Sequence, residues 1–324
     1  MIYRRIATLL ALAGLAGSVL AVDGRNAGSL LLFPEFDNSM GCVTVVTVTN
    51  TDAAGGDVDV EFVYIGRYGP DPRNYDIDCE EFNRTETLTA NDTLTLLTYF
   101  HNPQHEQGYL YVFARDGINS PIDHDYLIGN TLTVEGLASF EYSINPVAYV
   151  AMASGDTNGN GLRDLDGTEY ETSADEILVP RFFGQTKSIR SELILIGLTG
   201  GAAFDTKVDF LIYNDNEEEF SAEHDFYCWD RVYLEEISAI FTNDYLANWT
   251  NDDPGEILGA DTYETGWFRM TGAQASSSST TIMDPAVYGV LVERLGNKGA
   301  SDLPFEVGSN ANGKLLARNL DGSF

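Results

Sequence analysis

The chain has 324 residues, of which 50 are acidic and 18 are basic, so its formal net charge is −32. A surface this negative repels nucleic acid and anionic lipid, which argues against both as partners, whereas it attracts cations. The acidic residues are scattered among Tyr, Phe, Val and Ile, so the composition is that of a folded protein and not of a disordered acidic tail.

The N-terminal segment predicts a signal peptide. MIYRR carries positive charge, IATLLALAGLAGSVLA is a short apolar run, and Val19 and Ala21 occupy the −3 and −1 positions of a cleavage site. We expect residues 1–21 to be removed, with an uncleaved anchor as the alternative. No later stretch approaches the roughly 18 apolar residues of a second span. The sequence therefore predicts a secreted or cell-surface protein, extracellular or periplasmic, with no membrane span after cleavage.

The remaining segments read as β-strands. Runs of about eight residues are rich in Val, Thr and Tyr and are separated by turn-forming stretches, as in VTVVTVTN, DAAGGD and VDVEFVYI. One short helix is expected within RVYLEEISAIFTNDYL. We predict an all-β chain of two tandem antiparallel β-sandwich domains, and a single closed barrel is the alternative.

Several segments recur in the same order, which predicts an internal duplication. CVTVVTVTN, from Cys42, resembles ELILIGLTG, from Glu192, and LLFPEF resembles ILVPRF. Further along, IDCEEFNRTETL resembles FYCWDRVYLEEI, and GYLYVFARD resembles YGVLVERLG. The predicted domains are a first sandwich over 22–150, an acidic linker over 151–176 and a second sandwich over 177–324.

The linker contains GDTNGNGLRDLDG, which has the residue types of a calcium loop. Calcium takes six to eight oxygen ligands, and a tight loop supplies them from alternate side chains and one carbonyl. Asp156, Asn158 and Asn160 occupy positions 1, 3 and 5 of such a loop, the Leu162 carbonyl position 7 and Asp164 position 9.

This stretch resembles the calcium loops of thrombospondin type 3 repeats and of the B-type repeats of bacterial surface proteins, and more distantly the EF-hand. The resemblance covers about a dozen residues and implies calcium as the cofactor. Position 12, where these loops carry a bidentate carboxylate, is Gly167, so Asp166 or Glu169 would have to supply that ligand. A polar linker without metal is the alternative.

Three cysteines in an exported chain predict one disulfide and one unpaired cysteine. In the repeat alignment Cys79 corresponds to Cys228, whereas Cys42 falls on Glu192. We therefore predict a disulfide between Cys42 and Cys79, with Cys228 free and buried beside Trp229. An interchain bridge through Cys228 is the alternative.

Aromatic residues suggest one further site. Trp229, Trp249 and Trp267 all lie in the second half and could form a platform on which sugar rings stack, with core packing as the alternative. The chain contains no GxSxG, HExxH, P-loop or dinucleotide motif, and its four histidines lack the spacing of a zinc site. We predict no enzyme, although a hydrolase with two converging carboxylates is an alternative.

Secretion, duplication, acidity and the calcium loop together predict an exported, non-catalytic structural or adhesive protein with a calcium-stiffened linker. Its expected partner is a cell-surface or matrix component, including another copy of itself or a glycan. A secreted carbohydrate-binding protein that uses the tryptophan platform is the second hypothesis.

Overall fold

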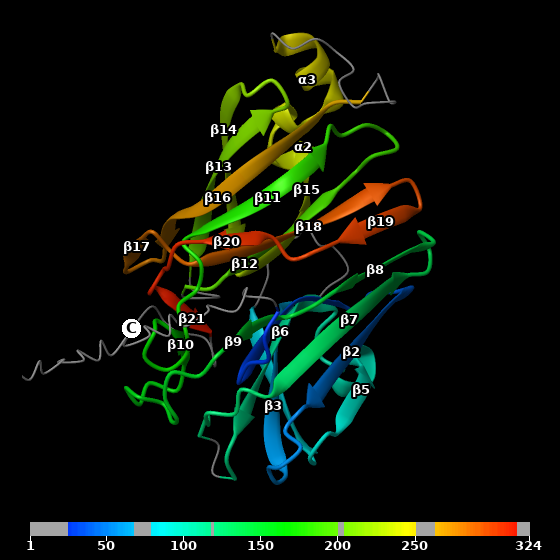
Figure 1. Ribbon diagram of the computed structural model, residues 1–324. Coiled ribbons are helices and arrows are strands. Elements are labelled where there is room, and N and C mark those ends of the chain that lie inside the picture. The colour runs from blue at the N-terminus through cyan, green and yellow to red at the C-terminus, as the bar shows by residue number, and fades with distance from the viewer. Residues whose placement is uncertain (1–24, 68–78, 118–119, 200–203, 251–262, 316–324) are drawn as a thin grey trace, which may run out of the picture.

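The structure is a computed structural model that describes residues 25–67, 79–117, 120–199, 204–250 and 263–315 (Figure 1). The predicted signal peptide lies outside these residues. The chain is nearly all β, with antiparallel sheets consistent with a sandwich fold, as the strand pattern predicted. Within the described ranges, the structure contains no helix with the length and apolarity to cross a membrane.

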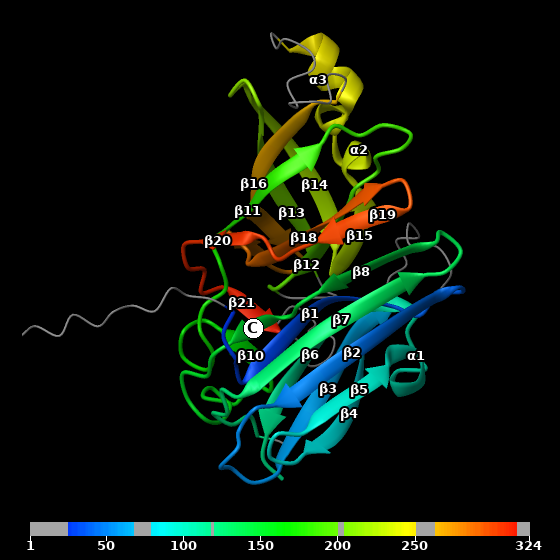
Figure 2. The same ribbon diagram turned by 45° about the vertical axis from the view of Figure 1, so that its right-hand side comes forward.

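The first sandwich consists of a larger sheet with the strand order β4-β3-β6-β1-β9 and a smaller sheet with the order β5-β2-β7-β8 (Figure 2). The bounds of its elements are β1 (Leu30–Asp37), β2 (Cys42–Asn50), β3 (Val58–Arg67), β4 (Glu80–Leu88), β5 (Thr93–Leu97), α1 (Thr98–His101), β6 (Gln107–Arg115), β7 (Leu127–Glu135), β8 (Phe140–Ile144) and β9 (Val147–Tyr149).

The second sandwich also has a larger sheet, β14-β13-β16-β11-β20 with β17 paired to β16, and a smaller sheet, β15-β12-β18-β19. Its elements are β11 (Glu176–Phe183), β12 (Glu192–Gly197), β13 (Asp205–Asn214), β14 (Glu219–Tyr227), β15 (Trp229–Tyr233), α2 (Leu234–Ile237), η2 (Ala239–Phe241), α3 (Asn243–Trp249), β16 (Thr265–Ser276), β17 (Thr281–Met283), β18 (Val287–Leu295), β19 (Lys298–Ser301) and β20 (Phe305–Val307). The expected short helix is thus three short helical segments, α2, η2 and α3.

The two sandwiches have the same strand order. When β1–β9 are matched in sequence with β11–β16 and β18–β20, each larger sheet and each smaller sheet has the same neighbours. The register of β1 shifts between Phe33 and Phe36, and that of β11 shifts between Val179 and Phe182, so the similar segments LLFPEF and ILVPRF both carry an irregularity at proline. A common strand order is what a duplication requires, and common ancestry stays a prediction.

Two of the sequence matches do not follow this order. Cys79 precedes β4, whereas Cys228 follows β14, the strand equivalent to β4, so the two cysteines lie at opposite ends of equivalent strands. GYLYVFARD forms β6 and YGVLVERLG begins in β18, and these strands are not equivalent. Both strands are almost continuously buried, and such apolar runs resemble one another whatever their position in the sheet.

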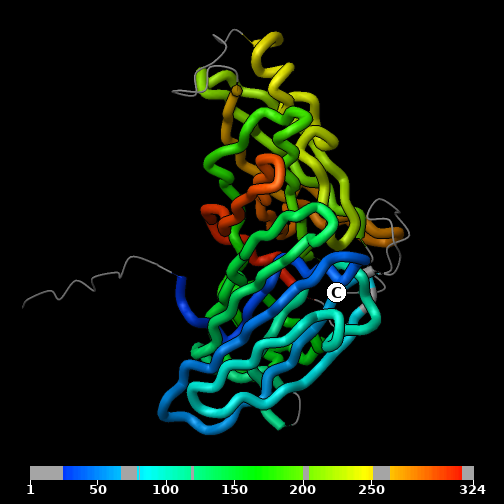
Figure 3. The backbone as a smooth tube through the Cα atoms, turned by 90° about the vertical axis from the view of Figure 1, so that its right-hand side faces the viewer, coloured from blue at the N-terminus to red at the C-terminus, as the bar shows by residue number. Residues whose placement is uncertain are grey.

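Burial divides the sheets into inner and outer ones. β1 and β6 of the first larger sheet, and β12 and most of β18 of the second smaller sheet, are buried on both faces. By contrast, β2 and β13 alternate between buried and more exposed residues, as strands with one free face do. One apolar cluster includes residues of both sandwiches, and a second lies inside the first sandwich. The two sandwiches therefore share a buried apolar interface, and Figure 3 shows them one above the other.

The linker between the sandwiches is itself folded. Its strand β10 (Arg163–Leu165) pairs with β21 (Gly313–Leu315), which follows the last strand of the second sandwich. The Arg163 guanidinium lies over the ring of Phe113 in the first sandwich, 5.1 Å from its centroid. The linker is thus attached to both sandwiches and is not a free tether.

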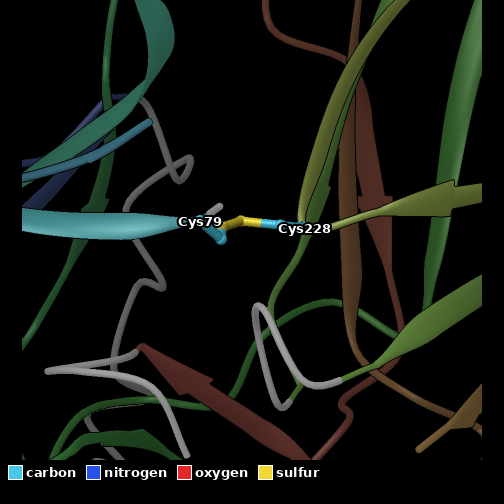
Figure 4. The surroundings of a disulfide bond; sticks show 2 residues. All are labelled: Cys79 and Cys228. Carbon is cyan, nitrogen blue, oxygen red and sulfur yellow. A yellow bond between two sulfur atoms is a disulfide. The ribbon is translucent and has the colours of Figure 1, made fainter. Parts of the chain in front are cut away.

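The predicted disulfide is wrong: Cys79 pairs with Cys228, with their Cα atoms 6.3 Å apart, and Cys42 is free (Figure 4). Cys42 begins β2 in the smaller sheet of the first sandwich, whereas Cys79 adjoins the larger sheet, close to the second sandwich. Cys228 lies between β14 and β15, where the chain passes from one sheet of the second sandwich to the other. The bond therefore joins the two sandwiches.

Replacing both Cys79 and Cys228 with serine should lower the free energy of unfolding by about 5 kcal/mol in the chain-entropy model, because the bond closes a loop of 149 residues. Urea denaturation under non-reducing conditions measures this loss. Cys42→Ser is the matched control and should change stability by less than about 1 kcal/mol. A larger loss for Cys42→Ser than for the double variant would contradict the assigned pairing.

Candidate functional site

A buried arginine binds carboxylates from both sandwiches. Arg231, on β15, has its Nη1 atom 2.8 Å from Glu35 Oε1 and its Nη2 atom 2.8 Å from Glu192 Oε2. Nη2 also donates to Glu135, and Asp37 Oδ2 lies 3.7 Å from Nη1. Glu35, Asp37 and Glu135 belong to the first sandwich and Glu192 to the second. Arg231 thus bridges the interface electrostatically.

A second arginine completes this cluster. The Nε atom of Arg294 lies 2.6 Å from Glu192 Oε2, its Nη2 atom donates to Glu135, and its guanidinium lies 3.8 Å from the ring centroid of Phe140. Together with Glu35 and Asp37, the cluster sets four carboxyl groups against two guanidinium groups. We call these six charged side chains the interface cluster.

Burial and the two arginines shift the pKa values of Glu35 and Glu135 in opposite directions. Burial raises the pKa of Glu35 from 4.5 to about 7, although Arg231 acts in the opposite direction. Burial also disfavours the charged form of Glu135, but hydrogen bonds and charge from Arg294 and Arg231 outweigh it and lower the pKa of that group. Glu35 additionally accepts a hydrogen bond from the Tyr142 hydroxyl. Glu35 is therefore partly protonated near neutral pH.

The three tryptophans do not form one platform. Trp229 is only 3% exposed, and its indole Nε1 donates to the Pro34 carbonyl 2.9 Å away, so it packs in the interface between the sandwiches. The platform prediction is wrong for this residue, because the core packing that was its alternative applies. Trp249 is exposed on α3. Trp267 stacks on Tyr213 with ring centroids 4.6 Å apart and remains partly exposed.

The loop predicted to bind calcium is organised around Asp156. Its carboxylate accepts hydrogen bonds from the backbone N–H groups of Gly159, Asn160 and Gly161, at 2.6, 3.2 and 2.7 Å. Asn160 in turn accepts from the N–H of Leu162 at 2.8 Å. Gly159 and Gly161 have φ values of 72° and 80°, a backbone conformation that residues other than glycine rarely adopt. The glycines therefore let the loop close around the first predicted ligand.

Asp164 is brought into the same loop. It is 1% exposed, and its Oδ2 atom accepts from the Asn158 side-chain amide at 2.6 Å. Its Oδ1 atom is buried with no hydrogen-bond partner and lies 3.9 Å from Lys314 Nζ. Leaving a buried carboxylate oxygen without a hydrogen bond is costly, so the position fits a cation ligand.

The two candidates for the missing ligand at position 12 have other partners. Asp166 accepts from the N–H and hydroxyl of Thr168, at 2.8 and 2.6 Å. Glu169 accepts from Arg163 Nη1 at 2.7 Å and from the N–H of Asp164 at 3.1 Å. Within the described ranges, no group of three or more His, Cys, Asp or Glu side chains is placed to hold a metal ion. Hydrogen bonds thus hold Asp156, Asn158, Asn160 and Asp164 in one loop, with Glu169 bonded to the Asp164 backbone, and the calcium site stays a prediction.

A groove of about 1230 Å³ lies between the sandwiches, beside β9, β11, β18, β19 and β20. Three of its charged side chains have partners: Arg181 Nε lies 3.0 Å from Glu293 Oε1, and Glu306 Oε1 accepts a hydrogen bond from the Tyr288 hydroxyl at 2.8 Å. We assign it no ligand. The interface cluster and the disulfide between the sandwiches are the features that sequence reasoning missed. The clearest available signal was the chain's continuously apolar strands, because strands buried on both faces need a second layer to cover them.

No family model matches the chain, and no curated protein matches it. Among solved structures, the chain is similar to one from Parabacteroides distasonis described as a "putative secreted protein", with 9% sequence identity, 85% of each chain covered and a TM-score of 0.19. A likeness this weak says nothing about the function of the present chain.

Replacing Arg231 with methionine should lower the free energy of unfolding by about 3–5 kcal/mol, because it leaves buried carboxylates without their counter-charge. Arg269→Met is the matched control: Arg269 is partly exposed and pairs with Glu176 at 3.2 Å, so its loss should cost about 1 kcal/mol or less. Guanidinium denaturation at neutral pH compares the two. Equal losses would show that Arg231 does not hold the interface.

Glu35→Gln should flatten the pH dependence of stability. Because the folded-state pKa of Glu35 is raised from 4.5 to about 7, its stabilising contribution is present below pH 4.5 and is lost as the pH rises toward 7. Such a shift corresponds to about 3 kcal/mol. The free energy of unfolding of wild type and Glu35→Gln, measured at several pH values between 4.5 and 7, isolates this contribution. Glu219→Gln, at an exposed position, is the control and should keep the wild-type pH dependence. A wild-type slope that persists in Glu35→Gln would contradict this assignment.

Proposed function

We propose that the chain is an exported, non-catalytic structural or adhesive protein whose two sandwiches act as one rigid unit at a cell surface or in an extracellular matrix. The observation that carries the proposal is the interface, where Arg231 binds carboxylates of both sandwiches and Cys79 and Cys228 join them covalently. Disulfides are typical of exported proteins and indicate an oxidising compartment. A pair of sandwiches fixed in this way suits a load-bearing role better than a hinge.

Calcium is the cofactor that we propose for the linker loop. The supporting observation is the buried Asp164 Oδ1 atom, which has no hydrogen-bond partner and belongs to the same short loop as Asp156, Asn158 and Asn160. Hard oxygen ligands of this kind suit calcium. A bound calcium ion would add positive charge beside Asp164, whose Oδ1 atom lies 3.9 Å from Lys314 Nζ. Because the disulfide already ties the sandwiches together, calcium would stabilise the loop more than the angle between them.

A carbohydrate-binding role is the second candidate, and one observation favours it. Trp267 and Tyr213 are a stacked aromatic pair on β16 and β13 in the outer sheet of the second sandwich, and the Tyr213 hydroxyl donates to Glu219 at 2.8 Å. Exposed rings beside a carboxylate suit sugar stacking. Loss of glycan-array binding in Trp267→Ala, with Trp249→Ala unchanged, would favour this role over the structural one.

Calcium should raise the melting temperature of wild type and not of Asp156→Ala. At the weak affinity of extracellular sites, with Kd on the order of 10⁻⁴–10⁻³ M, 10 mM calcium would stabilise the folded state by about 1.4–2.7 kcal/mol. Asp215→Ala, an exposed turn residue with the same loss of charge, is the control. Identical melting of wild type in calcium and in chelator would reduce the loop to a polar linker.

Pulling the chain from its two ends tests the load-bearing role. While the disulfide is intact, force cannot extend the chain segment between its two cysteines, which are 149 residues apart in sequence. The fully unfolded wild type should therefore be shorter than the variant lacking both Cys79 and Cys228 by roughly 500 Å, at about 3.5 Å per residue. Single-molecule force spectroscopy measures this difference. Equal lengths would remove the covalent basis of the proposed role.

A further inference from the structure

The smaller sheet of the first sandwich presents one face that no other described element covers. This sheet lies toward the viewer in Figure 3, with its strands β5, β2, β7 and β8 in front. Alternate residues of each strand point outward. The outward residues are Val43, Val45, Thr47, Thr49, Thr93, Thr95, Leu97, Ile128, Asn130, Leu132, Val134, Glu141 and Ser143. We call them the neutral face.

The neutral face carries a single charged residue, Glu141, on its edge strand β8. This is unexpected in a chain with a net charge of −32. The outer sheet of the second sandwich is charged, with Asp205, Lys207 and Asp209 on alternate positions of β13. The absence of charge is therefore a property of this face and not of every exposed sheet in the part of the chain that the structure describes.

Large apolar side chains are exposed on the neutral face. Val43 and Ile128 are each 44% exposed, and Leu97 and Leu132 are each 40% exposed. Val45 pairs with Leu97 on one side and with Leu132 on the other, so these three residues form an apolar row across β5, β2 and β7, whereas Ile128 pairs with Thr49. At the margin of the sheet, further apolar residues are strongly exposed, namely Met40, Tyr99, Phe100 and Leu137. A contiguous apolar surface of this kind marks an interaction site.

The threonine side chains of the neutral face are preorganised by hydrogen bonds within the face. Thr47 and Thr95 are joined by a side-chain hydrogen bond of 3.1 Å, and Thr49 and Thr93 by one of 2.9 Å. Valine, isoleucine and threonine have few side-chain rotamers, so little conformational entropy is lost when such a surface is covered. A hydroxyl group both donates and accepts, so a row of threonines is complementary to an identical row.

We infer that the neutral face binds the same face of a second copy of this chain. Two copies with a net charge of −32 repel each other, and the repulsion is weakest where the opposed surfaces lack charge. A basic partner would instead be drawn to the acidic surfaces. Twofold symmetry places identical patches opposite each other, which suits a face that is complementary to itself. Sheets packed face to face about 10 Å apart give such an interface its geometry.

The inference deepens the proposed adhesive function by naming its partner, and it rests on that function. The two can nevertheless fail separately. A disrupted neutral face would abolish dimers and leave the disulfide and the interface cluster intact, so the thermal transition of the single chain would not change.

Sedimentation equilibrium of the mature chain at concentrations up to about 100 µM tests the inference. We expect wild type to dimerise, and more tightly as salt is added, because salt screens the repulsion between the copies. Leu132→Glu should raise the dimer dissociation constant at least tenfold, because it buries a charge in the face of each copy. Leu295→Glu, at a site of similar exposure on β18, is the matched control and should not change it.

Thr95→Glu is the second variant, in case Leu132→Glu does not fold, and the same loss of dimer is expected. Circular dichroism and the melting temperature establish folding for each variant. A monomeric wild type throughout the concentration range would overturn the inference and indicate a different partner for the neutral face. Dimers that persist in folded Leu132→Glu and Thr95→Glu would place the contact elsewhere.

Discussion

The structure depends on the contact of Arg231 with the carboxyl groups around it. The chain has 18 basic residues against 50 acidic ones. One of these basic residues, Arg231, lies in the interface between the sandwiches with its side chain 8% exposed. Without it, carboxylates from both sandwiches would be brought together in a medium of low dielectric, where like charges repel strongly. The surrounding features add to this contact: the Trp229 hydrogen bond to Pro34, the folded linker and the disulfide.

This interface decides which surfaces remain available for partners. The central strands β1 and β6 of the first larger sheet, and β12 and most of β18 of the second smaller sheet, are covered on both faces, so the outer sheets offer the broader free faces for other molecules. These outer sheets differ in chemistry. That of the first sandwich is nearly uncharged, and that of the second combines acidic residues with the Trp267–Tyr213 pair. One rigid body thus presents two distinct surfaces, as a structural or adhesive component would need.

Strand content and turns could be predicted because they depend on local patterns of apolar residues and turn formers. The turn around Asp156 could be predicted for the same reason, since its hydrogen bonds stay within a few residues. The pairing of Cys79 and the burial of Trp229 could not, because both depend on how two distant sheets meet. Likewise, nothing in the spacing of Glu169 shows that Arg163 would occupy its carboxylate.

The central claim is that the two sandwiches form one unit. Differential scanning calorimetry of the oxidised mature chain at neutral pH tests it most directly, by comparing the calorimetric enthalpy with the van't Hoff enthalpy. If the interface cluster and the disulfide couple the sandwiches, a single transition with equal enthalpies is expected. Two resolved transitions, each with the heat of one sandwich, would show that the sandwiches unfold independently and would contradict the account.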